Sequence, residues 1–161
     1  MLLGIEKVRA IKIVTNITYS RVFNVDVFWQ GAGDTMKNLS MAVVIKGSTV
    51  LIQQRYRAAK GMVYEFPGGS VEDDESEEFA AIRELWEETG VAGVRTLGEY
   101  TCKNQFGGDS HYVVMEPAAD VFPTTTAPEK SLHWLPLGDI PRDHLYPADK
   151  EFIERYLPDY M

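Results

Sequence analysis

Residues 68–91, GGSVEDDESEEFAAIRELWEETGV, constrain the fold of this chain more than any other segment. They contain 9 of its 24 acidic residues and 1 of its 16 lysines and arginines. Acidic residues stabilise a helix N-terminus, and Gly90 provides the left-handed residue that commonly ends a helix. The segment therefore predicts a helix over residues 75–89, whose apolar side we expect to face the core through Phe79, Ile82, Leu85 and Trp86.

Three carboxylates share the other side of this predicted helix. Glu84 and Glu88 are one turn apart, and Glu87 lies beside them. Like charges at this spacing destabilise a helix by about 0.2–0.5 kcal/mol per pair. Mg²⁺ binds oxygen ligands, so a bound Mg²⁺ would turn this repulsion between carboxylates into a stabilising interaction. Charge alone favours a solvated acidic helix. The spacing, next to a glycine turn at 68–69 that leaves backbone oxygens accessible, instead indicates a metal site.

Outside this segment, strand-like runs alternate with turn residues. β-branched runs predict strands at residues 20–31, 39–47, 48–56, 94–104, 110–122 and 131–137. A hairpin is expected around Gly47 and Ser48, and apolar residues at helical spacing predict a second helix over 148–157. Mixed strands with two helices indicate an α+β or a layered α/β/α class. Because no linker or repeat divides the chain, we expect a single domain over residues 1–161.

The acidic segment resembles the signature of the Nudix hydrolases. That signature reads Gly, five residues, Glu, seven residues, Arg-Glu, apolar, any, Glu-Glu, any, Gly, apolar, and the chain matches it with Gly69, Glu75, Arg83, Glu84, Leu85, Glu87, Glu88, Gly90 and Val91. The runs VLIQQRYR, YEFPGG and LHWLPLGDIP also resemble the family, so the resemblance covers about residues 40–157. It implies an α/β/α sandwich with a mixed β-sheet, and we expect residues 1–39 to supply N-terminal strands.

The resemblance also implies a metal-dependent site. It assigns the metal ion, Mg²⁺ with Mn²⁺ as a substitute, to the carboxylates of Glu84, Glu87 and Glu88 and to the carbonyl of Gly68. It gives the loop and the helix four residues that hold them together, namely Gly69, Glu75, Arg83 and Gly90. The implied reaction is attack of water on a phosphorus of a diphosphate linkage, which releases a nucleoside monophosphate.

Further candidates lie outside the helix. Glu129 is our candidate general base, and it would fit equally well as an exposed loop residue without a catalytic role. Arg55 and Arg57 could bind phosphate oxygens, since a guanidinium binds them in bidentate fashion, although Arg57 would equally fit surface charge. The aromatic residues that could stack on a base, but that more often belong to a core, are Tyr56, Phe66, Phe106 and Trp134. The spacing of His111, His133 and His144 predicts no zinc site.

Several substrates and rival functions stay open. The resemblance implies a small nucleoside diphosphate derivative: a nucleoside triphosphate, a nucleotide sugar or ADP-ribose. Gly107 stands where the ADP-ribose branch often has proline, which argues against that substrate. The alternatives are a non-catalytic nucleotide-binding module and an RNA 5′-pyrophosphohydrolase. An isopentenyl diphosphate isomerase would use a cysteine and a different metal set, and the intact hydrolase signature argues against it.

The composition of the chain limits the classes of binding partner and the cellular locations that we expect. The net charge of −8 argues against binding of a long nucleic acid through a basic surface. No apolar run is long enough to span a bilayer, and the single Cys102, which we expect to be a buried apolar residue, fits a cytoplasmic location. Dimers are common among relatives, so a homodimer through the N-terminal strands is an open expectation.

Overall fold

Strand β1 (Leu39–Lys46) carries an almost continuous apolar run because both of its faces are covered. Successive side chains of a strand point to opposite faces of the sheet. Met41, Val43 and Ile45 accordingly enter one core cluster, whereas Ala42 and Val44 enter another. Layers must therefore pack on both sides of the sheet that contains β1.

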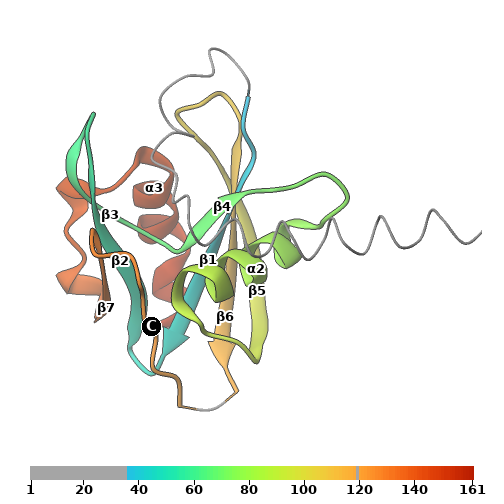
Figure 1. The fold of residues 1–161 in the computed structure, drawn as a ribbon, viewed down its shortest axis with the longest axis vertical. Coiled ribbons are helices and arrows are strands. Elements are labelled where there is room, and N and C mark those ends of the chain that lie inside the picture. The colour runs from blue at the N-terminus through green and yellow to red at the C-terminus, as the bar shows by residue number, and fades with distance from the viewer. Residues whose placement is uncertain (1–35, 119) are drawn as a thin grey trace, which may run out of the picture. The chain divides into compact units, whose positions relative to one another are not determined.

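The computed structural model describes residues 36–118 and 120–161, which form a seven-stranded sheet (Figure 1). The strands that follow β1 are β2 (Thr49–Arg57), β3 (Gly61–Glu65), β4 (Gly68–Ser70), β5 (Val94–Lys103), β6 (Asp109–Pro117) and β7 (Lys130–Leu135). Their main order is β3-β2-β1-β6-β5, with β4 paired to β1 and β7 paired to β2. The sheet is mixed, because β1 pairs in parallel with β6 and antiparallel with β2 and β4.

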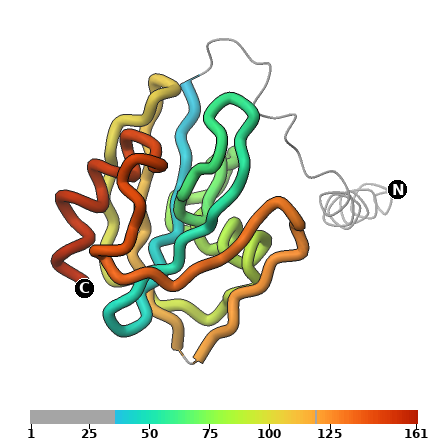
Figure 2. The backbone as a smooth tube through the Cα atoms, turned by 90° about the vertical axis from the view of Figure 1, so that its left-hand side faces the viewer, coloured from blue at the N-terminus to red at the C-terminus, as the bar shows by residue number. Residues whose placement is uncertain are grey.

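Two helices cover opposite faces of the sheet (Figure 2). Helix α2 (Glu77–Thr89) packs over Ala42 and Val44, and helix α3 (Pro147–Arg155) packs over Val43 and Ile45. Short 3₁₀ turns at Leu137–Asp139, Arg142–His144 and Leu157–Tyr160 flank α3. This arrangement confirms the predicted α/β/α sandwich with a mixed β-sheet.

Helix α2 begins two residues later than predicted. The Ser76 hydroxyl accepts a hydrogen bond from the amide of Phe79, at 3.2 Å, and so caps the N-terminus. Gly90 ends the helix in the left-handed conformation, with φ of 71°, as predicted. The predicted apolar face was partly wrong: Phe79 and Trp86 are 60% and 54% exposed.

The exposure of those two aromatic residues has a geometric cause. The buried residues of α2 are Ala80, Ala81, Leu85 and Thr89. On a helix, Phe79 and Trp86 lie about half a turn from Glu84 and Glu88. Turning the two glutamates inward, toward β4 and β7, therefore turns the two aromatic rings outward.

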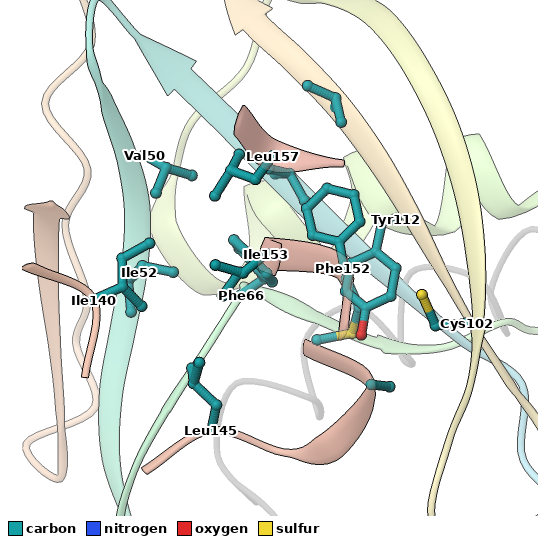
Figure 3. Packing of buried hydrophobic residues seen from close by; sticks show 14 of the residues in the cluster. Val50, Ile52, Phe66, Cys102, Tyr112, Ile140, Leu145, Phe152, Ile153 and Leu157 are labelled. Atoms are coloured by element: carbon teal, nitrogen blue, oxygen red, sulfur yellow. The ribbon is translucent and has the colours of Figure 1, made fainter. Parts of the chain in front are cut away.

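The cluster beneath α3 is built around stacked aromatic rings (Figure 3). The ring of Tyr112 stacks on that of Phe152 with centroids 4.3 Å apart, and Phe66 meets both rings edge-on. Phe66 is thus a core residue and not a surface for a base. Cys102 lies in the same cluster, and burial raises the pKa of its thiol to about 11, which confirms that it is a buried apolar residue.

Other predictions differ in detail from the structure. The hairpin at Gly47 and Ser48 is confirmed, with Lys46 paired to Thr49. The strand predicted to reach residue 122 ends at Pro117, and β3 and β4 were not predicted. The described part from Met36 to Met161 is one compact unit. The strand predicted at 20–31, the dimer through it and the single domain over 1–161 concern residues 1–35, which lie outside the described residues.

None of the helices within the described residues is long and apolar enough to cross a membrane.

Candidate active and metal site

Strand β4 lies close to both β1 and α2, and two glycines provide the necessary space (Figure 1). A Cβ atom at Gly68 would overlap the carbonyl oxygen of Ser40. A Cβ atom at Gly69 would overlap the carboxylate of Glu84. These positions need glycine because neighbouring atoms leave no room for a side chain, and the result is a bare backbone directly beside the helix.

Arg83 ties the loop before α2 to the helix. Its Nε and Nη2 donate to the two carboxylate oxygens of Glu75, at 3.1 and 2.6 Å, and Nη2 also donates to the carbonyl of Ser70, at 3.1 Å. The hydrogen bond from Arg83 lowers the pKa of Glu75, while Glu75 raises the pKa of Arg83. Because Glu75 precedes the helix and Arg83 lies on it, this ion pair joins the loop to α2.

Two of the three metal-site candidates face the same arginine. Nη1 of Arg83 lies 2.8 Å from Oε1 of Glu84 and 3.6 Å from Oε2 of Glu87. Burial raises the pKa of both carboxyl groups, and the charge of Arg83 opposes that rise. Glu84 is the better covered of the two, since Glu87 is exposed on the helix surface.

Glu88 has a different environment. Its Oε2 accepts a hydrogen bond from the backbone N–H of Gly68, at 3.1 Å, and its Oε1 accepts one from Nζ of Lys130, at 3.0 Å. The side chains of Glu88 and Lys130 are only 14% and 6% exposed. Burial raises the pKa of Glu88, and the Lys130 ammonium lowers it. Lys130 was not predicted as a site residue, because nothing in the sequence links it to Glu88.

The three carboxylates are not arranged as a closed metal-binding cluster in the described residues. Within residues 36–118 and 120–161, no three His, Cys, Asp or Glu side chains are gathered closely enough to hold a metal ion. In this part of the chain, Glu84 and Glu87 pair with Arg83, and Glu88 pairs with Lys130. The donor set nevertheless fits a hard divalent cation: all three groups are carboxylates, and two of them lie against the bare backbone of β4.

A second polar cluster lies on β2 and β3. Arg55 and Arg57 are on the same face of β2 as Gln53, which pairs with Glu65 across the strands. The Glu65 carboxylate accepts hydrogen bonds from Nη2 of Arg57, at 3.0 Å, and from Nε2 of Gln53, at 3.1 Å, and lies 3.7 Å from Nη1 of Arg55. Glu65 therefore holds both predicted substrate-binding arginines in place, a role that the sequence did not indicate.

This polar cluster is continuous with the acidic helix. Strand β7 pairs with β2 so that Lys130 lies opposite Arg55, which places the ammonium that contacts Glu88 on the same face as the two arginines. Glu129 is exposed in the turn that leads into β7, next to Lys130. The structure thus links Glu88 of α2 through Lys130 to Arg55 of β2, and Glu129 is the chain neighbour of Lys130.

The remaining aromatic and histidine candidates are scattered. Tyr56 is exposed on β2, whereas Trp134 packs against the cluster beneath α2 and Phe106 against the cluster beneath α3. The histidines contact different partners, since His111 bonds to Thr101 and His144 to the carbonyl of Met62. In the described residues the histidines belong to no cluster that could hold a metal ion.

Comparison with known proteins agrees with this geometry. Residues 36–156 match the NUDIX domain. The CTP pyrophosphohydrolase of Escherichia coli (strain K12) is 30% identical over 120 residues, which are 72% of this chain and 87% of that protein. The RNA pyrophosphohydrolase of Caulobacter vibrioides (strain NA1000 / CB15N) is 39% identical over 61 residues, which are 38% of this chain and 36% of that protein.

A solved structure has the same fold. It is a bifunctional NMN adenylyltransferase/ADP ribose pyrophosphatase from Francisella tularensis, complexed with AMP and a Mn ion. The TM-score is 0.62 at 20% identity, and the match covers 89% of this chain and 46% of that chain. The signature at residues 69–91 is complete and the NUDIX domain matches residues 36–156, so the chain belongs to the NUDIX family.

Proposed function

We propose that this protein uses a divalent cation, Mg²⁺ or Mn²⁺, to hydrolyse the diphosphate linkage of a nucleoside diphosphate derivative, with release of a nucleoside monophosphate. As a NUDIX protein with a pyrophosphohydrolase relative aligned over 120 residues, it is a hydrolase of phosphoric anhydrides. The observation that carries the finer proposal is the placement of Glu84 and Glu88 against the backbone of Gly68 and Gly69.

In this proposal Glu84, Glu87 and Glu88 hold the cation, together with the carbonyl of Gly68. A bound cation would lower the pKa of the attacking water and neutralise phosphate oxygens. The chain's own contribution is to fix the carboxylates: Arg83 and Glu75 hold the loop, and the N–H of Gly68 orients Glu88. The Mn ion in the related fold supports the choice of metal.

The second cluster supplies the phosphate contacts. We assign Arg55 and Arg57 to the substrate's phosphate groups, with Glu65 holding their guanidinium groups in position. Glu129 is our candidate for the general base, because it lies in the turn beside Lys130, at the edge of the acidic site. A positioned base would take the proton from the attacking water.

The substrate class is a small nucleotide. The CTP pyrophosphohydrolase relative, which aligns over most of both chains, favours a nucleoside triphosphate over a nucleotide sugar or ADP-ribose. The RNA pyrophosphohydrolase aligns over only 61 residues, and the net charge of −8 disfavours a long RNA. A purely nucleotide-binding module is disfavoured because every carboxylate of the signature is present.

A substrate panel tests this function. The purified protein is incubated with Mg²⁺ or Mn²⁺ and with CTP, other nucleoside triphosphates, a nucleotide sugar, ADP-ribose or 5′-triphosphate RNA, and products are separated by chromatography. We expect at least one small nucleotide to be cleaved to its nucleoside monophosphate, and CTP is the first candidate. Cleavage of RNA alone would contradict the substrate class, and binding without any cleavage would contradict the hydrolase proposal.

Gly69→Ala is expected to lower kcat/KM by about ten- to a hundredfold, because a Cβ atom there overlaps the Glu84 carboxylate and displaces it. Gly138→Ala is the matched control, since a Cβ atom at that position meets no atom within 4 Å. Steady-state kinetics on the substrate found by the panel measure both variants. Equal activity of Gly69→Ala and the wild type would show that the position of Glu84 does not matter for the reaction.

A further inference from the structure

The ion pair between Lys130 and Glu88 suggests a role for a residue outside the family signature. We propose that Lys130 is the internal counter-ion of Glu88 in the metal-free protein, and that it competes with the divalent cation for this carboxylate. This inference rests on the proposed function, because it takes Glu88 as a metal ligand. Lys130 would thereby set how tightly the free protein binds its cation.

The pair is built into the fold. Lys130 and Glu88 lie 42 residues apart and come from β7 and α2. Strands β2 and β7 are aligned over six facing residue pairs, which fix the position of Lys130 directly opposite Arg55. With only 6% of its side chain exposed, Lys130 is no solvated surface lysine. Burying an ammonium is costly unless a counter-charge accompanies it, and Glu88 provides that charge.

Both oxygens of Glu88 already have partners in this arrangement. Oε2 accepts from the backbone of Gly68 and Oε1 from Lys130. The Gly68 contact is compatible with a cation, since it only orients the carboxylate. The ammonium is different, because two positive charges at one carboxylate repel each other. Cation binding must therefore weaken the contact between Lys130 and Glu88.

The second internal cation is held much more firmly. Arg83 bonds to Glu75 and to the carbonyl of Ser70 as well as to Glu84, so that its guanidinium is anchored in the loop. Among the described residues, Glu88 is the one carboxylate within ion-pair distance of Nζ of Lys130. A lysine ammonium on a flexible four-carbon chain can leave that single partner. Lys130 is thus the exchangeable cation of the two.

The neighbours of Lys130 indicate where its charge would act after leaving Glu88. It lies on the same face as Arg55, with Arg57 further along β2. These are the residues that we assign to substrate phosphates. In the loaded protein, the same ammonium would therefore add to phosphate binding.

Metal binding to the nucleotide-free protein tests this proposal. Mn²⁺ is titrated by calorimetry into the wild type, Lys130→Met, Lys130→Gln and Lys150→Met. Lys150 is exposed on α3, on the other face of the sheet, so its replacement changes the net charge equally without touching the site. We expect both Lys130 variants to bind Mn²⁺ about tenfold more tightly than the wild type, and Lys150→Met to bind like the wild type.

Thermal unfolding gives a second readout that does not depend on activity. Without metal, Lys130→Met is expected to unfold at a lower temperature than the wild type, because Glu88 loses its counter-charge. Added Mn²⁺ should raise the unfolding temperature more in Lys130→Met than in the wild type. Lys130→Gln, whose amide can still donate to Glu88, keeps the comparison valid if the methionine variant is poorly folded.

The failure of this inference differs from the failure of the proposed function. If the wild type binds Mn²⁺ and the two Lys130 variants bind it equally or more weakly, the competition is refuted and the metal site stands. If neither the wild type nor any variant binds Mn²⁺, the metal site itself is refuted, and the inference falls with it.

Discussion

Glu88→Gln is expected to lower kcat by at least about a hundredfold while the fold persists. Glutamine keeps the shape of the side chain, so its oxygen can still accept the hydrogen bond from Gly68. It lacks the negative charge that a divalent cation requires, and its amide group faces the Lys130 ammonium as a poor partner. The loss should therefore be one of cation binding and turnover rather than of folding.

The control for this variant is Glu77→Gln. Glu77 lies on the same helix, but its side chain is about half exposed and lies near His111, away from Glu88. We expect its kcat to match that of the wild type. Kinetics at several Mg²⁺ concentrations, together with circular dichroism of each variant, make the comparison. Normal turnover by Glu88→Gln would remove Glu88 from the reaction.

The stability of the protein is expected to fall as the pH rises from about 4 to about 7, because of Asp149. This residue is buried in the first turn of α3, where the hydroxyl of Tyr112 donates to its Oδ1 at 2.7 Å. Burial raises the pKa of Asp149 from 3.8 to about 7, with Glu65 adding to the rise and Tyr112 and Lys60 opposing it. The folded state therefore binds a proton that the unfolded state releases over this range.

The sign follows from that difference in proton binding. Below about pH 4 both states hold the proton, and Asp149 makes its full contribution to the free energy of unfolding. Above about pH 7 this contribution has been lost. A rise of the pKa from 3.8 to about 7 corresponds to about 4 kcal/mol. That is a large share of the stability of a small domain, which is typically about 5–15 kcal/mol.

Asp149→Asn isolates this effect from that of other buried carboxyl groups. The asparagine oxygen can still accept the hydrogen bond from Tyr112, but the residue does not titrate. Urea unfolding at pH 5 and pH 8 measures both proteins, and we expect the variant to lose less stability between these values than the wild type. Parallel pH profiles for the two proteins would show that Asp149 is not the group responsible.

Local sequence signals predicted the elements that depend on local chemistry. Gly90 ends α2 because glycine adopts the left-handed conformation without a steric penalty, which follows from the residue type alone. The hairpin at Gly47 and Ser48 likewise follows from turn residues between two apolar runs. The mixed sheet and the two covering helices follow from the order of these elements and from the resemblance to a known family.

What the sequence missed depends on contacts between distant segments. Contacts with β4 and β7 set the direction in which α2 faces. The sequence does not reveal these contacts, and the prediction that Phe79 and Trp86 face the core was therefore wrong. The β3 and β4 strands, Gly61–Glu65 and Gly68–Ser70, are only five and three residues long, which is too short for a clear alternation of apolar and polar residues.

The same limit applies to the site. The Glu75 and Arg83 pair is eight residues apart and belongs to a known signature, whereas the pairing of Lys130 with Glu88 depends on the packing of β7 beside α2. Glu65 is brought to Arg57 by the register of β2 with β3. Neither strand register nor helix orientation can be read from residue types alone.

The most direct test of the metal site is anomalous X-ray diffraction from crystals grown with Mn²⁺, recorded at the manganese absorption edge. We predict a peak within about 2.5 Å of carboxylate oxygens from Glu84 and Glu88. A peak elsewhere on the molecule, or well-ordered glutamates that keep their contacts with Arg83 and Lys130 at saturating Mn²⁺, would contradict the account.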